Sequence, residues 1–178
     1  GVLHNRRAPL RFDGRSRCQR RLVGPQEDSS HGQVHGALAE LAQGIRAEFR
    51  FDERGEYSIE VDPRRVAEGD MAFLTGLGFN RISLGVQDFN AEVQRAVNRI
   101  QSEEETLRVI HAARANGFKS VSIDLIYGLP KQTLEGFGVT LDKVIATDPD
   151  RLSIYNYAHM PTMFKPQRRI HEEDLPAP

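Results

Sequence analysis

The run Ile123-Asp124-Leu125-Ile126-Tyr127-Gly128-Leu129-Pro130 constrains the fold of this chain more than any other stretch. It is apolar, carries one acid and ends in a glycine and a proline. A buried strand that delivers a carboxylate near its C-terminal end, followed by a loop, is how an α/β barrel presents a functional group. The run therefore predicts a buried parallel strand with Asp124 at the mouth of a site.

Other segments repeat this plan along the chain. Short β-type runs alternate with segments whose apolar residues recur at helical spacing. We expect strands at 57–61, 81–87, 120–127 and 152–157, and helices at 37–49, 64–77, 102–116 and 133–146, with a short helix after Asn90. Ser102 and Glu105 fit a capping box at the start of one helix, and Thr133 can cap another. Helices between consecutive strands require parallel pairing with crossover connections.

Four such strands form either half a barrel or a small doubly wound sheet. The barrel is favoured because each strand carries a polar residue near its C-terminal end: Glu60, Gln87, Asp124 and Asn156. In addition, no Gly-x-Gly-x-x-Gly loop opens a helix, as a dinucleotide-binding fold would require. The fold class we expect is α/β, a partial (β/α) barrel of about four parallel strands.

The composition is that of a globular protein: 39% of the 178 residues are hydrophobic and 28% are charged. The net charge of −1 gives no general attraction to nucleic acid or to a membrane. The single cysteine, Cys18, excludes an intrachain disulfide and a metal cluster held by cysteines of this chain alone. Because no apolar run reaches the length of a membrane span and no signal peptide is visible, we expect a cytoplasmic location.

Three regions are expected along the chain. Residues 1–36 are irregular and rich in arginine, with no lysine, and we interpret them as a basic tail rather than a nucleic-acid-binding arm. Residues 37–160 would form the partial barrel. Residues 161–178 are polar and rich in proline, and we expect no closing element there.

The polar residues at the strand ends admit two interpretations. Each one alone is as compatible with hydrogen bonding to the neighbouring backbone as with ligand binding. Taken together, Glu60, Gln87 and Asp124 at one mouth favour a binding site. Arg99 could hold a carboxylate there, although a single arginine is more often a solvated charge. We predict no metal site and no catalytic residue, and no serine lies in a hydrolase motif.

The motifs of this chain resemble a known family. They are Glu60-Val61-Asp62-Pro63, Gly85-Val86-Gln87-Asp88-Phe89-Asn90, Val97-Asn98-Arg99, Asp124-Leu125-Ile126-Tyr127-Gly128-Leu129-Pro130 and Asn156-Tyr157-Ala158-His159. Together they resemble the oxygen-independent coproporphyrinogen III oxidases (dehydrogenases), which are radical SAM enzymes of bacterial haem synthesis. The match runs from about residue 56 to residue 178. The related radical SAM haem chaperones share the Gly-Val-Gln and Tyr-Gly-Leu-Pro motifs but usually lack Gln-Asp-Phe and Asn-Tyr-Ala-His.

The resemblance implies a fold, an activity and a set of ligands. The fold would be a partial (β/α)6 barrel, of which this chain holds the third to sixth strands. The family uses a [4Fe-4S] cluster and S-adenosylmethionine to convert two propionate side chains of coproporphyrinogen III to vinyl groups, as a monomer. By match of motif, Glu60 would contact a first S-adenosylmethionine, whereas Gln87, Arg99, Asp124 and Ala158 would contact a second.

Two motifs of the family are not found in this sequence: the three-cysteine cluster motif and Gly-Gly-Gly-Thr-Pro. Arg17 to Gly36 has the composition of a GC-rich gene read out of frame, so we hypothesise a frameshifted or truncated enzyme that is inactive as this chain. Two alternatives remain open. One is a non-enzymatic module that binds S-adenosylmethionine or porphyrin, as a haem chaperone would. The other is an unrelated barrel enzyme acting on phosphates, which would need a Gly-rich loop that the sequence lacks.

Overall fold

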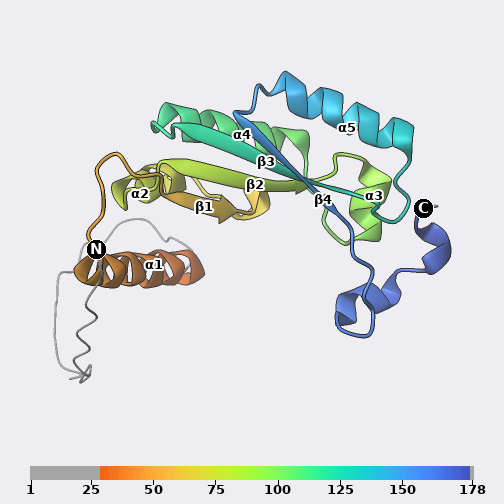
Figure 1. The fold of residues 1–178 in the computed structure, drawn as a ribbon, viewed down its shortest axis with the longest axis horizontal. Coiled ribbons are helices and arrows are strands. Elements are labelled where there is room, and N and C mark those ends of the chain that lie inside the picture. Colours follow the sequence, from red (N-terminus) through yellow and green to blue (C-terminus); the bar gives the residue numbers. More distant parts are fainter. Residues whose placement is uncertain (1–28, 177–178) are drawn as a thin grey trace, which may run out of the picture. The chain divides into compact units, whose positions relative to one another are not determined.

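The computed structural model describes residues 29–176, and its central feature is a parallel sheet (Figure 1). The chain divides into two compact units, residues 1–41 and 42–178, and all four strands belong to the second. The elements in chain order are α1 (Ser29–Glu48), β1 (Ser58–Val61), η1 (Pro63–Arg65), α2 (Asp70–Gly76), β2 (Arg81–Gln87), α3 (Ala91–Ala96), α4 (Glu103–Ala115), β3 (Ser120–Tyr127), α5 (Leu134–Ala146), β4 (Arg151–Asn156), η2 (Lys165–Arg169) and η3 (Glu172–Asp174).

The strands lie in the order β1-β2-β3-β4, and every neighbouring pair is parallel. This confirms the predicted α/β class with crossover helices. The register places Gly85 of β2 opposite Asp124 of β3, and Asp124 opposite Ser153 of β4. Because the carboxyl ends of parallel strands lie at the same edge of a sheet, the polar residues near these ends gather at that edge.

One face of the sheet forms the core of this unit. α4 and α5 run along that face in Figure 1. Side chains alternate along each strand, so every second residue of the two central strands points to the same side. These residues are buried: Ile82, Leu84, Val86, Val121, Ile123 and Leu125. The opposite face carries the smaller and polar residues of the same strands, and this face bears the candidate site.

Hydrogen bonds confirm the predicted helix starts. The Ser102 hydroxyl accepts a hydrogen bond from the Glu105 amide at 3.1 Å, while the Glu105 carboxylate accepts one from the Ser102 amide at 2.8 Å. The Thr133 hydroxyl likewise accepts from the Gly136 amide at 3.0 Å. These bonds satisfy backbone donors that the first turn of a helix leaves unpaired.

Three expectations are wrong in detail. The helix predicted at 64–77 is two elements, η1 and α2, because the chain turns at Gly69, whose φ of 88° lies in the left-handed region. α1 begins at Ser29 instead of Ala37, so residues 29–36 are not irregular. The C-terminal segment contains η2 and η3, and the Lys131 amide donates to the Asp174 carbonyl at 2.6 Å.

The remaining expectations for the N-terminal segment lie outside the described residues. They include Cys18 and the greater part of the stretch that we hypothesise to be out of frame, up to residue 28. Among the described residues, no helix is both long and apolar enough to cross a membrane.

Replacing Ile123 with alanine should lower the free energy of unfolding by about 2–5 kcal/mol, because the side chain is fully buried in the sheet face that packs on the helices. Leu134 is the control, since its side chain is 85% exposed and its replacement by alanine should change stability by less than about 0.5 kcal/mol. Urea unfolding followed by circular dichroism measures both. Equal losses in the two variants would contradict the assignment of the core.

Candidate functional site

The candidate site is centred on Gly85, where β2 departs from regular pairing. Gly85 pairs with Asp124, but the next paired residue is Gln87, so Val86 forms a bulge. Gln87 then has a φ of 67°, an uncommon value for a residue with a side chain. Bulges commonly redirect side chains near functional sites. Here the Gln87 amide lies back over Gly85.

Three predicted residues converge on this glycine. A Cβ atom built on Gly85 would lie 3.0 Å from Nε2 of Gln87 and 3.2 Å from Nη2 of Arg99. The same atom would lie 3.9 Å from Oε1 of Glu60. A larger residue at position 85 would therefore push into the side chains that the sequence singled out. The structure brings Glu60, Gln87 and Arg99 together at one point of the sheet.

Asp124 lies beside this point on the neighbouring strand. Its carboxylate accepts a hydrogen bond from the Ser83 hydroxyl at 2.6 Å. Ser83 is in turn paired with Glu60 of β1 in the parallel register. Asp124 is half-buried, so one carboxylate oxygen is engaged by Ser83 and the carboxylate keeps further acceptor capacity.

Ala158 is placed differently from the other four predicted residues. It is exposed, and its carbonyl oxygen accepts a hydrogen bond from Nε2 of Gln167 at 3.0 Å. The Oε1 atom of the same Gln167 accepts from the Met160 amide at 2.5 Å, so one side chain holds this loop at two points.

Gln87 and Arg99 contribute to the wall of a cavity of about 370 Å³, whereas Glu60, Asp124 and Ala158 are not among the residues that line it. Apolar side chains make up most of the remaining lining: Ala96, Val97, Ile126, Leu129, Tyr157, Pro166 and Ile170. Burial raises the pKa of the Tyr157 phenol. An apolar cavity with a few convergent polar groups is the usual form of a small-molecule site.

The loop that carries Arg99 is built to return that side chain to the sheet. α3 is capped at its start by Asn90 and ends in a Schellman motif. Asn98 adopts a φ of 53° and donates to the Arg95 carbonyl, while the Arg99 amide donates to the Gln94 carbonyl at 2.8 Å. Asparagine tolerates this left-handed conformation better than most residues. The Val97-Asn98-Arg99 motif therefore ends helix α3 and directs the Arg99 side chain toward β2.

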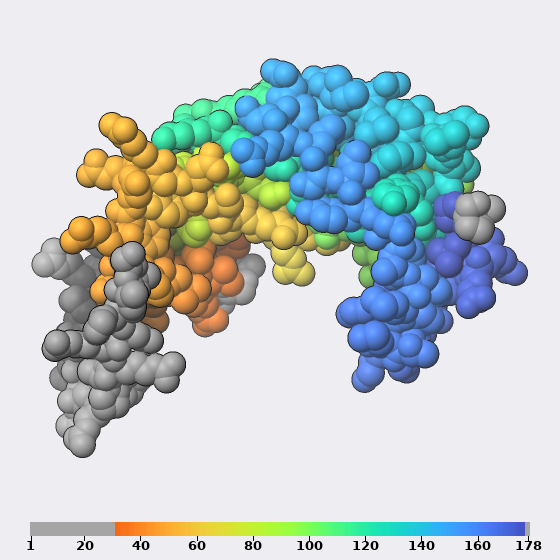
Figure 2. Space-filling model, viewed as in Figure 1, coloured from red at the N-terminus to blue at the C-terminus, as the bar shows by residue number. Residues whose placement is uncertain are grey.

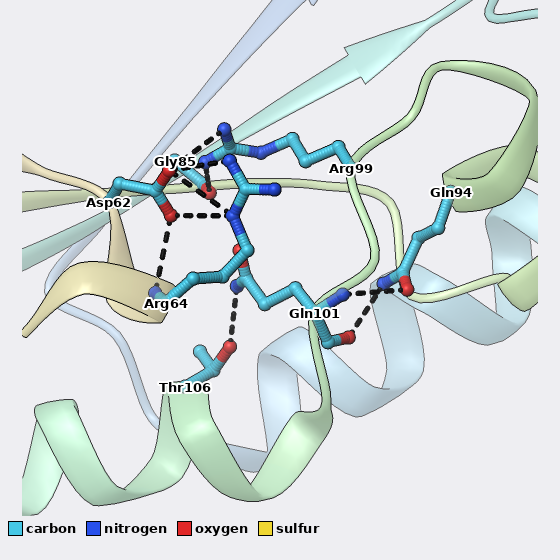
Figure 3. Close-up of polar contacts among 7 residues, drawn as sticks. All are labelled: Asp62, Arg64, Gly85, Gln94, Arg99, Gln101 and Thr106. Carbon is cyan, nitrogen blue, oxygen red and sulfur yellow. Dashed lines mark hydrogen bonds and ion pairs between the residues drawn. The ribbon is translucent and has the colours of Figure 1, made fainter.

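Buried polar residues that we did not predict support the same loops. Asp88 is 1% exposed, and its carboxylate accepts hydrogen bonds from the Thr140 hydroxyl at 2.6 Å and the Gln132 amide group at 2.5 Å. Figure 3 shows that Gln94 bonds the backbone of Gln101, whose own side chain donates to Thr106 at 2.8 Å. No periodic pattern reveals these bonds, because they join residues of different elements.

Arg99 makes two polar contacts on the sheet. Its Nη2 donates to the Gly85 carbonyl at 2.6 Å, and its Nη1 lies 3.3 Å from Oδ2 of Asp62 (Figure 3). Burial lowers the pKa of the Arg99 guanidinium, and the negative charge of Asp62 opposes that effect. The pKa of Asp62 is lowered mainly by its hydrogen bonds to Arg64, with a further contribution from the charge of Arg99.

These pKa directions give a testable pH dependence. Because folding lowers the pKa of Asp62, its ionised form stabilises the fold above the unfolded-state pKa of about 3.9, and this contribution is lost as the pH falls through the lower folded-state pKa. Replacing Asp62 with asparagine should cost on the order of 1 kcal/mol at pH 7.

Urea unfolding at pH 7 and near pH 3 measures this difference. The gap between native protein and variant should shrink at the lower pH. A gap that stays constant across the range would show that the Asp62 charge does not carry the effect.

Comparisons with known proteins identify relatives of this chain. The Radical SAM superfamily model matches residues 27–144. The oxygen-independent coproporphyrinogen III oxidase of Pseudomonas aeruginosa is 54% identical over 145 residues, which are 80% of this chain and 32% of that protein. The enzyme of the same name from Escherichia coli is 52% identical over 141 residues, which are 79% of this chain and 31% of that protein. The chain thus spans about a third of the length of these relatives.

A solved structure of the same enzyme is also similar to this chain. The coproporphyrinogen III oxidase from Escherichia coli, described as a radical SAM enzyme, superposes with a TM-score of 0.77 at 51% identity, over 81% of this chain and 33% of that one. A radical S-adenosylmethionine methyltransferase from Kitasatospora setae, solved with cobalamin and a [4Fe-4S] cluster, gives a TM-score of 0.59 at 16% identity over 74% of this chain and 26% of that one. That second likeness concerns the fold alone.

Proposed function

We propose that this chain, which belongs to the radical SAM superfamily, is the part of an oxygen-independent coproporphyrinogen III oxidase that holds S-adenosylmethionine. The observation that carries the proposal is the convergence of Glu60, Gln87 and Arg99 on Gly85, with Asp124 opposite that glycine in the sheet. The whole enzyme would convert two propionate groups of coproporphyrinogen III to vinyl groups in the cytoplasm, as a monomer.

The residues fit the cofactor chemically. The carboxylates of Glu60 and Asp124 can accept hydrogen bonds from ribose hydroxyls or an ammonium group. The Arg99 guanidinium can hold a carboxylate, and the Gln87 amide can both donate and accept. When bound, S-adenosylmethionine supplies the hydrogen-abstracting chemistry of the superfamily. This chain's own residues would bind and orient it.

Gly85 leaves room for the ligand because it has no side chain. With an added methyl group 3.0 Å from Gln87 and 3.2 Å from Arg99, both side chains would have to shift. We also propose that Ala158 contacts the cofactor, through a loop that Gln167 holds in place.

The residues of this chain do not supply the ligands that an iron-sulfur cluster requires. Such clusters are held by several cysteine thiolates, and the 178 residues contain one cysteine. We therefore derive no step that passes through a cluster. A module that binds S-adenosylmethionine or porphyrin without catalysis remains the second candidate, and this cysteine count favours it for the chain on its own.

Calorimetric titration of the chain with S-adenosylmethionine tests the proposed site. Asp124→Asn should weaken binding by at least about tenfold, since a charge-assisted hydrogen bond contributes about 1.5–3 kcal/mol and about 1.4 kcal/mol is tenfold in affinity. Gly85→Ala should also weaken it, because the new methyl group displaces Gln87 and Arg99. Asp142→Asn is the matched control, because it removes the same charge from an exposed position on α5. Absence of binding to the native chain, or equal affinity of all variants, would contradict the proposal.

Anaerobic reconstitution with iron and sulfide separates holding the cofactor from catalysing its cleavage. We expect less than one [4Fe-4S] cluster per chain by iron analysis, because one cysteine cannot supply the thiolates. Titration with a porphyrin under the same conditions tests the second candidate. A stoichiometric cluster would show that other side chains of this chain bind iron.

A further inference from the structure

One carboxylate contacts two arginines beside the proposed site. Figure 3 shows the guanidinium groups of Arg64 and Arg99 next to each other, both facing the carboxylate of Asp62. Arg64 approaches in a fork: its Nε lies 2.9 Å from Oδ1 and its Nη2 lies 2.6 Å from Oδ2. Nη1 of Arg99 lies 3.3 Å from the same Oδ2. Asp62 therefore joins the end of β1 to the loop that carries Arg99.

The backbone holds Asp62 in one orientation. It follows the last residue of β1 and is the N-cap of η1, where its Oδ1 accepts from the Arg64 amide at 3.2 Å. Pro63 occupies the first position of η1, where its fixed φ suits a helical turn. With the cap and the fork of Arg64 acting together, the carboxylate has little freedom to follow Arg99.

The Arg99 guanidinium is held by few contacts. Its side chain is 22% exposed, and its Nε is buried without a hydrogen-bond partner. The guanidinium is therefore fixed through its terminal nitrogens, by the Gly85 carbonyl and by Asp62. Each of these two nitrogens carries a second N–H group, and Arg99 forms part of the cavity wall.

We propose that Asp62 is a positioning residue, which fixes the plane of the Arg99 guanidinium so that its remaining N–H groups can receive the carboxylate of the ligand, and that Arg64 holds Asp62 in place. The proposal rests on the proposed function, because it takes the ligand to be S-adenosylmethionine. Asp62 itself does not touch the ligand. Its effect is confined to the carboxylate end, which 5′-deoxy-5′-methylthioadenosine lacks.

Calorimetry with these two ligands tests the proposal. Asp62→Asn should weaken the binding of S-adenosylmethionine about tenfold, equivalent to about 1.4 kcal/mol, and should leave the affinity for 5′-deoxy-5′-methylthioadenosine within about twofold. Arg64→Gln should weaken the binding of S-adenosylmethionine alone, and by less than Asp62→Asn does. The reason is that Asp62 still accepts a hydrogen bond from the backbone amide of residue 64. Asp142→Asn is again the control for lost charge. Equal weakening of both ligands, or of neither, would overturn the positioning role.

A second measurement does not require a ligand. NMR of the native chain should show the Arg99 guanidinium N–H groups as separate signals, because contacts at both terminal nitrogens slow rotation about the Nε–Cζ bond. Asp62→Asn should average these signals, and Arg99→Lys identifies them by removing them. Unchanged signals in Asp62→Asn would overturn the proposal. If the native chain bound no S-adenosylmethionine, the proposed function would fail, while this measurement would still decide whether Asp62 positions Arg99.

Discussion

The parallel register of β2 against β3 is the constraint on which the site depends. It sets Gly85 opposite Asp124 and places Ser83 where its hydroxyl reaches the Asp124 carboxylate. Side chains alternate along a strand, so the same register that buries Ile123 between strands and helices turns Asp124 to the other face. A slip of one residue would exchange the two faces, so the core and the site are fixed together.

The spacing of apolar residues and the capping residues were sufficient to predict most of the helices and strands. The strands, their order along the chain and the starts of α4 and α5 follow from apolar spacing and from capping residues such as Ser102. The gathering of Glu60, Gln87 and Asp124 followed from a topological rule, because the carboxyl ends of parallel strands share an edge. That rule places residues near one another without fixing what their side chains contact.

The remaining features come from contacts between distant segments. Asp88 and Thr140 are 52 residues apart and meet inside the fold, so neither helical nor strand periodicity marks them. Thr140 occupies a buried position on α5, and its hydroxyl donates there to the Asp88 carboxylate. Conversely, Ile154 of β4 is 46% exposed, and Figure 2 shows the blue residues of this strand at the surface. The bulge at Val86 also depends on tertiary structure, since Asp88 holds the chain beyond it.

The charges around Gly85 bear on which ligand fits. Glu60, Asp62 and Asp124 are acidic, whereas Arg64 and Arg99 are basic, so the group carries one negative charge in excess. S-adenosylmethionine has an ammonium, a sulfonium and a carboxylate, and its net charge is therefore positive by one. A purely anionic ligand such as a phosphate would gain from Arg99 but would face Glu60 and Asp124 without compensation. The balance favours a ligand that carries both signs of charge.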